Sequence, residues 1–131
     1  MGWTGSVGLS IPTGSDPAPD YDASPVTFPG PFLNNWGPGS TPRYQKGIDG
    51  TVTLSGTLTR SSGAPSVGED ITAIPADRAP ATNQTRSTFV TGGVGTMSIQ
   101  ITTTGAIKVA AHSGVVGPFT IELNTVSWVE A

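Results

Sequence analysis

Hydrophobic and polar residues alternate with a period of two over much of the chain after residue 43, the pattern of strands that bury one face. In residues 51–59, every polar position of this alternation is Thr or Ser. The inward positions are Val52, Leu54 and Leu58, and Gly56 takes the remaining inward position without a side chain. The pattern therefore predicts one half-buried strand with a polar face of hydroxyl groups.

Asp49-Gly50, just before this strand, is typical of a β-hairpin turn. A two-residue turn would place the apolar Ile48 on the polar face of the hairpin. A three-residue loop over residues 48–50 instead sets Tyr44 beside Leu54. We therefore predict the three-residue loop, with Gly50 at positive φ in a G1-type bulge.

Further strands are expected later in the chain. Residues 61–69 are loop-like in composition, and an apolar stretch over 71–74 ends at Pro75. Residues 87–91, 96–102 and 106–111 are β-rich and separated by glycines, which predicts a meander. The last strand changes its buried parity at Asn124-Thr125, which predicts a bulge or bend there. About six or seven short strands favour an all-β fold, a small antiparallel β-sandwich or jelly roll.

Residues 1–42 differ from the rest of the chain because they hold eight of the twelve prolines and five of the nine aromatic residues. Prolines fix φ and remove backbone donors, so this segment predicts an extended, Pro/Gly-rich N-terminal arm without a core of its own. Its large aromatic side chains are expected to anchor the arm on a neighbouring subunit or another protein. These anchors are Trp3, Tyr21, Phe28, Phe32 and Trp36. We therefore divide the chain into an arm, 1–42, and a β-sandwich domain, 43–131.

The composition of the chain argues against several classes of binding partner. A chain of 131 residues is expected to form one domain, and only 11% of its residues are charged. The formal charge is −3 and the six cations are scattered, so no nucleic-acid partner is expected. No apolar run approaches the about 18 residues of a membrane span, so no membrane partner is expected. Without cysteine, the domain depends on packing or association for its stability.

Catalytic motifs are lacking in the sequence. His112 is the single histidine and has no second histidine with which to share a metal, and neither a G-x-S-x-G nor a phosphate-binding glycine motif occurs. The acids that a glycosidase would need are interpreted as solvated loop residues. These are Glu69, Asp70, Asp77 and Glu122. We therefore expect no enzyme activity, no catalytic residue, no metal and no cofactor.

Binding a glycan without cleaving it requires no catalytic acids, only an exposed aromatic ring with amide, cationic or imidazole groups nearby. Residues of these types lie in the expected loops and strand ends. The candidate glycan contacts are Tyr44, Asn83, Gln84, Arg86 and His112.

Four motifs carry a resemblance to a known family. They are Leu33-Asn34-Asn35-Trp36, the hairpin from Arg43-Tyr44-Gln45-Lys46 to Asp49-Gly50-Thr51-Val52-Thr53-Leu54-Ser55-Gly56, the turn Ile74-Pro75-Ala76-Asp77-Arg78-Ala79-Pro80, and the closing strand Ile121-Glu122-Leu123-Asn124-Thr125-Val126-Ser127-Trp128. Over about residues 32–131 the chain resembles the C-terminal head domains of tail fibres and minor tail proteins of long-tailed bacteriophages, especially those of actinobacteria.

The resemblance implies a β-sandwich in the virion, assembled as a homo-oligomer, usually a trimer, that contacts host-surface glycans. The expected function is that of a non-enzymatic structural protein at the tail tip, with the arm docked on other virion proteins. Two alternatives stay open. A domain with an anchoring arm also suits a capsid decoration protein, and a glycan-cleaving enzyme would need paired acids beside an exposed aromatic ring.

Overall fold

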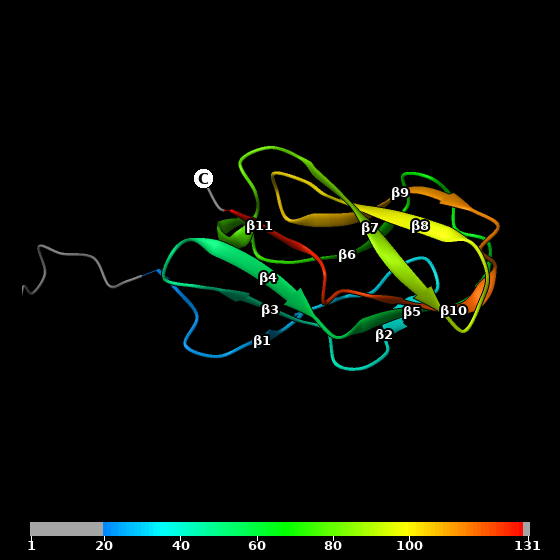
Figure 1. Cartoon of the computed structure of the whole chain (residues 1–131), viewed down its shortest axis with the longest axis horizontal. Coiled ribbons are helices and arrows are strands. Elements are labelled where there is room, and N and C mark those ends of the chain that lie inside the picture. The colour runs from blue at the N-terminus through cyan, green and yellow to red at the C-terminus, as the bar shows by residue number, and fades with distance from the viewer. Residues whose placement is uncertain (1–19, 130–131) are drawn as a thin grey trace, which may run out of the picture.

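The computed structural model describes residues 20–129, which form eleven strands and one short 3-10 helix, η1. The strands make two antiparallel sheets packed as a small β-sandwich, which confirms the predicted all-β class (Figure 1). The elements are β1 (Val26–Thr27), β2 (Trp36–Pro38), β3 (Arg43–Lys46), β4 (Thr51–Ser55), β5 (Thr57–Gly63), β6 (Asp70–Ala73), η1 (Ala76–Arg78), β7 (Gln84–Thr91), β8 (Thr96–Ile101), β9 (Ala106–Ser113), β10 (Gly117–Glu122) and β11 (Ser127–Val129).

The smaller sheet has the order β1-β3-β4-β11 and the larger one the order β2-β5-β10-β7-β8-β9-β6. The predicted meander is present as β7, β8 and β9, and β6 occupies the predicted apolar stretch before Pro75. β5 continues to Gly63, into the segment expected to be a loop.

The two edge strands of the larger sheet, β2 and β6, are joined through residues 31–35. The Leu33 amide donates a hydrogen bond to the Ile71 carbonyl at 2.9 Å, and the Thr72 hydroxyl donates to the Pro31 carbonyl at 3.0 Å. On the other side, the Ser61 amide donates to the Asn35 carbonyl at 2.9 Å. Since these bonds connect both edges to one segment, the larger sheet curls toward a barrel.

The hairpin of β3 and β4 follows the prediction. Tyr44 pairs with Leu54, the Gly50 amide donates to the Gly47 carbonyl, and Gly50 has φ of 86°. This is the three-residue loop in which a type I turn is followed by a glycine at positive φ.

Gly56 corrects one expectation. The chain does not continue as a single strand with an empty inward slot; it passes at Gly56 from β4 in the smaller sheet to β5 in the larger one. Gly56 has φ of 85°, and a Cβ at this position would overlap the Thr41 carbonyl. Beside it, the predicted bend at residues 124–125 carries the chain from β10 to β11, and the Leu123 amide donates to the Gly56 carbonyl at 3.0 Å. Both crossings therefore form one corner of the sandwich.

The predicted boundary at residue 42 also needs correction. β1 and β2 belong to the two sheets, and Phe28 and Trp36 are only 4% and 5% exposed within the core of this chain. Their burial leaves these two side chains unable to anchor the segment on another protein. Prolines did not prevent the pairing because β1 and β2 are short edge strands, where a missing donor is tolerated.

The other expected anchors are placed differently. Phe32 is partly buried and packs against the core, and Tyr21 is partly exposed. Trp3 lies outside the described residues. The segment from residue 20 to residue 42 is therefore part of the domain.

Candidate functional site

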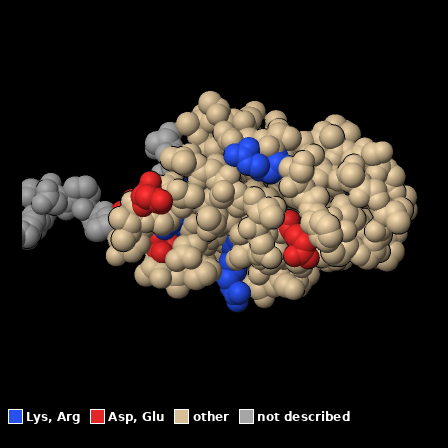
Figure 2. Space-filling model, in the orientation of Figure 1, with Lys and Arg blue, Asp and Glu red and all other residues tan. Residues whose placement is uncertain are grey.

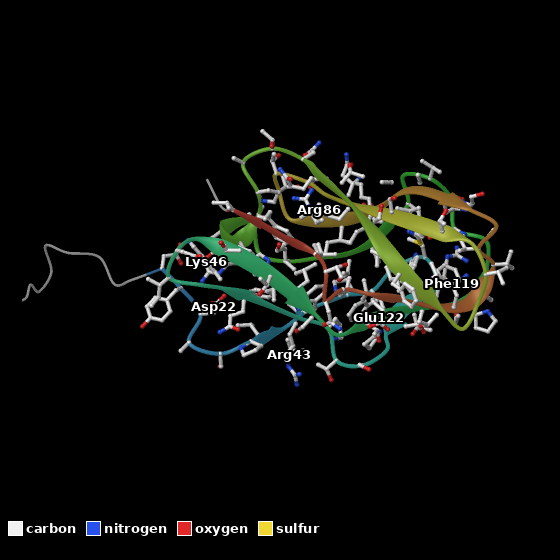
Figure 3. The ribbon with its side chains drawn as sticks, viewed as in Figure 1. Asp22, Arg43, Lys46, Arg86, Phe119 and Glu122 are labelled. Atoms are coloured by element: carbon white, nitrogen blue, oxygen red, sulfur yellow. The ribbon has the colours of Figure 1, made fainter. Side chains whose placement is uncertain are left out.

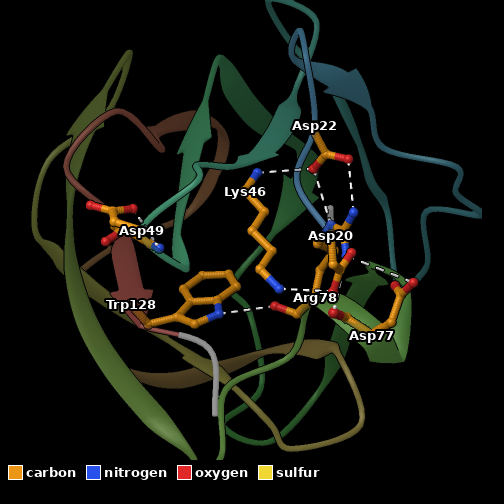
Figure 4. A network of polar contacts seen from close by, with 8 residues as sticks. Asp20, Asp22, Lys46, Asp49, Asp77, Arg78 and Trp128 are labelled. Carbon is orange, nitrogen blue, oxygen red and sulfur yellow. Dashed lines mark hydrogen bonds and ion pairs between the residues drawn. The ribbon is translucent and has the colours of Figure 1, made fainter. Parts of the chain in front are cut away.

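Arg78 is the centre of a polar cluster at the end of the sandwich where the described chain begins (Figure 4). Its Nε and Nη2 donate to the two carboxylate oxygens of Asp22, at 3.0 and 2.9 Å, and its Nη1 donates to Asp20 at 2.8 Å. The geometry at Asp22 is the bidentate fork of a strong ion pair. We call Asp20, Asp22, Lys46 and Arg78 the Arg78 cluster.

Further hydrogen bonds from Lys46, Asp22 and Trp128 extend the same cluster. Lys46 Nζ donates to Asp20 at 2.8 Å, and the Lys46 amide donates to the Asp22 carboxylate at 2.9 Å. The Asp22 amide donates in turn to the Lys46 carbonyl at 2.9 Å. From β11, the indole Nε1 of Trp128 donates to the Arg78 carbonyl at 3.0 Å. The cluster therefore holds residues 20–22 against β3 and η1.

The charges within the cluster stabilise one another. The hydrogen bond from Lys46 lowers the pKa of Asp20, assisted by Arg78, and the hydrogen bonds from Arg78 lower the pKa of Asp22. The same carboxylates raise the pKa of Arg78. Since the Arg78 guanidinium donates to carboxylates of its own chain, the Arg78 cluster acts as a clamp that holds residues 20–22 in place.

Three of the motifs that carry the phage resemblance meet in this cluster. The hairpin motif supplies Lys46, the turn motif supplies Arg78, and the closing strand supplies Trp128. Sequence reasoning missed the cluster because its acids lie in the segment interpreted as an arm. The pair of acids at positions 20 and 22, two residues apart like side chains on one face of an extended chain, was the available signal.

A second cluster corrects the interpretation of Glu69 as a solvated acid. Trp36 Nε1 donates to Glu69 at 2.7 Å and Arg60 Nε donates to the same oxygen at 3.1 Å. Burial by itself would raise the pKa of Glu69, but hydrogen bonds from Arg60, the Ser66 amide and Trp36 outweigh it and lower the pKa. This buried pair fixes β2 and β5 to the loop before β6.

The residues expected to contact a glycan do not form one site. Tyr44 is 7% exposed, its ring lies 6.2 Å from that of Phe28, and burial raises the pKa of its hydroxyl. It therefore cannot act as an exposed platform. Asn83 accepts a hydrogen bond from the Thr103 amide at 3.1 Å, which ties it to the turn after β8.

Gln84, Arg86 and His112 are also separated from one another or turned inward. Gln84 and Arg86 pair with the buried Ile101 and Ile99, so both lie on the inner face of β7, where Arg86 donates to Gln84 at 2.9 Å. His112 pairs with Met97 at the other end of the sheet, about 14 Å from Gln84 along the strands at about 3.4 Å per residue. The His112 Nδ1 atom is buried without a hydrogen-bond partner among residues 20–129.

An exposed aromatic ring does occur, at Phe89 on the outer face of the larger sheet. Ile121 and Val90 are paired and point into the core, so the adjoining pairs, Glu122 with Phe89 and Thr120 with Thr91, point outward. Phe89 is 68% exposed. We define the Phe89 face as Ser87, Phe89, Thr91, Thr120 and Glu122.

Hydroxyl groups surround the ring on this face. Thr120 and Thr59 on the neighbouring strand have their hydroxyl oxygens 2.9 Å apart, and the Thr91 hydroxyl donates to the Thr120 carbonyl at 3.5 Å. Glu122 is half-buried opposite Phe89 and lies well apart from Arg86 (Figure 3). The sequence did not reveal this face, because it does not show that the strand of Phe89 pairs with the strand of Glu122, and Glu122 was interpreted as a solvated acid.

The surroundings of the face are sparsely charged. Figure 2 shows few acidic or basic side chains toward the viewer, and the right-hand end, where the turn 92–95 and the loop 114–116 lie, shows only uncharged ones. Exposed valines stand in these two segments, Val94 and Val116. Within residues 20–129 no enclosed pocket is found, and no group of three or more His, Cys, Asp or Glu residues is arranged to hold a metal ion.

Comparison with known proteins finds no matching family model, no matching curated protein and no matching solved structure. Among the described residues, no helix is long and apolar enough to cross a membrane.

Proposed function

We propose that the chain is a non-enzymatic structural protein exposed on a phage particle, a tail-tip or minor tail protein that binds a host-surface glycan through the Phe89 face. The observation that carries this proposal is the ring of Phe89, which is 68% exposed on a face otherwise lined by hydroxyls and one carboxylate. In this proposal the domain assembles as a homo-oligomer, a trimer, in the virion.

The chemistry of the face suits a sugar. The apolar C–H face of a pyranose stacks on an exposed ring, and the rim hydroxyls of the sugar need donors and acceptors beside it. The hydroxyl oxygens of Thr91 and Thr120 accept hydrogen bonds, as does the Glu122 carboxylate, and either Thr120 or Thr59 keeps a hydroxyl proton to donate. A flat face with one ring accommodates a chain of sugars laid across it, without a closed cavity.

The phage origin rests on the resemblance, and the Arg78 cluster supports it. The hairpin, the turn and the closing strand are distant in sequence, yet Lys46, Arg78 and Trp128 contribute to one buried polar network. Motifs that meet in this way form a structural unit rather than three separate coincidences of turn composition.

The proposal is tested by binding of the full-length protein to cell-wall polysaccharides purified from actinobacteria and to immobilised oligosaccharides. We expect Phe89→Ala to weaken binding at least about tenfold, the scale of an aromatic hot spot. Ile48→Ala is the matched control because Ile48 is 86% exposed on the tip of the β3–β4 hairpin, outside the Phe89 face.

Equal binding by Phe89→Ala and the unchanged protein would remove this site from the proposal, and so would a lack of binding to every glycan. Release of soluble sugar from the polysaccharide would instead establish the glycan-cleaving alternative.

A further inference from the structure

The carboxylate of Glu122 is not neutralised by a cation in the part of the chain that the structure describes. Among residues 20–129, no Lys or Arg forms an ion pair with it. The cations of the larger sheet are engaged elsewhere: Arg60 with Glu69, Lys108 with Asp70 at 3.3 Å, and Arg86 with Gln84 on the inner face.

Glu122 and Phe89 form a combined acceptor for a cation. They are directly opposite on β10 and β7, and side chains in such pairs have Cβ atoms about 4.5–5.5 Å apart. A positive group above them is attracted by the carboxylate and also by the face of the aromatic ring. The hydroxyls of Thr91 and Thr120 remain beside it for neutral polar groups.

We propose that the Phe89 face selects a glycan that carries free amino groups, an unacetylated hexosamine polymer, over its N-acetylated or acidic counterparts. This inference rests on the proposed function, because it names the ligand class of the same site. A hexosamine ring stacked on Phe89 spans the about 4.8 Å to the neighbouring strand, which brings its ammonium group to Glu122. An acidic sugar there would meet a like charge.

The test compares two probes of equal length and linkage, a glucosamine pentamer and an N-acetylglucosamine pentamer, by calorimetry with the full-length protein at pH 6 and low salt. We expect the glucosamine pentamer to bind about fivefold tighter, the effect of one exposed charge pair about 4 Å apart. Raising the salt concentration to 0.5 M should remove most of this difference, since it screens exposed charges.

Glu122→Gln keeps the shape of the side chain and removes its charge, so it should abolish the preference while retaining binding of the acetylated pentamer. Asp77→Asn is the matched control: it changes the net charge equally at an exposed carboxylate of η1, and it should keep the preference. Thermal unfolding verifies that both variants are folded.

The outcomes separate the two proposals. If both pentamers bind equally and both lose binding in Phe89→Ala, the charge selection is wrong and the glycan-binding function stands. A preference that survives in Glu122→Gln also overturns the selection. If neither pentamer binds and the cell-wall polysaccharides fail as well, the proposed function fails with it.

Discussion

Trp36 fills space in the core and also satisfies a buried carboxylate. Its ring meets that of Phe119 edge-to-face at a centroid distance of 5.5 Å, and its Nε1 donates to Glu69. We predict that Trp36→Ala lowers the free energy of unfolding by about 3–5 kcal/mol, the usual cost of emptying a buried aromatic site. Equilibrium unfolding in urea measures it.

Trp36→Phe separates the two roles of this side chain. It keeps most of the ring packing and removes the donor to Glu69, so its cost should be about 1–3 kcal/mol. A loss below about 1 kcal/mol for Trp36→Ala would mean that residues near 36 are not held in the core and would restore the interpretation of this segment as a separate arm.

Asp22 makes the stability of the protein depend on pH. Its pKa lies below the ordinary value of 3.8 because Arg78 stabilises the charged form. A carboxylate with a lowered folded-state pKa contributes stability that is complete above its unfolded pKa and is lost as the pH falls through the folded pKa. We therefore predict that the free energy of unfolding declines from about pH 5 downward, and that Asp22→Asn flattens this decline.

The same variant should also be less stable at pH 7, by about 1.5–3 kcal/mol, because Arg78 loses its two hydrogen bonds to a charged carboxylate and keeps only Asp20 as a close ion-pair partner. Asp77→Asn provides the comparison, because the Asp77 carboxylate is exposed and lies 3.8 Å from the same guanidinium, too far for a hydrogen bond. If the two variants have equal stability from pH 3 to pH 7, the clamp is unimportant for folding.

At the scale of elements, the corner between the sheets depends on Gly56. Ala at a left-handed position costs about 1–2 kcal/mol by backbone conformation alone. We predict this cost for Gly50→Ala, because no atom lies within 4 Å of a Cβ placed there. Gly56→Ala should cost at least about 1 kcal/mol more, since its Cβ would overlap Thr41 and overpacking adds about 1–3 kcal/mol.

Chemical denaturation of both glycine variants tests this difference. Equal losses would indicate that the segment of Thr41 moves aside easily, and that the corner is held by other contacts, such as the bond from the Gly56 amide to the Asn124 side chain at 3.2 Å.

Local patterns explain which elements could be predicted from the sequence. The register of the β3–β4 hairpin follows from the parity of Tyr44 and Leu54 and from one glycine, all within a few residues. The crossing from one sheet to the other at Gly56 has no such signal in the local sequence. Leu54 and Leu58 keep the same parity because both sheets turn their inner faces to one core, so a change of sheet resembles a continuous strand.

The contacts that build the candidate site are non-local, and the local sequence pattern does not show which residues meet across the fold. Phe89 and Glu122 meet because β10 pairs with β7, and this strand order depends on how the whole larger sheet is assembled. Similarly, Asp22 and Arg78 form an ion pair although they are 56 residues apart in the sequence. The alternation of a strand fixes which residues share a face, but not which strand lies beside it.

At the scale of the molecule, the proposed binding face and the start of the described chain are separated. The described chain begins at the left end of Figure 1, beside the β3–β4 hairpin, and the uncharged turn 92–95, which follows β7, lies at the other end. In the proposed virion protein, residues before Asp20 would connect to the particle while the far end faces the host. Of the segment 1–42 that was expected to attach, residues 20–42 belong to the domain and residues 1–19 lie outside the described residues.

This separation gives a prediction on the whole chain. The core cluster lies between Phe28 and Trp128, so removing residues 1–19 should leave a folded domain that still binds glycan through Phe89. The shortened protein should fail to join phage particles that incorporate the full-length chain.

Sedimentation of the two forms reports their oligomeric state, and quantification of the chain in purified particles reports its copy number. A handful of copies supports the tail, whereas hundreds support capsid decoration, and normal incorporation of the shortened protein would contradict attachment through residues 1–19.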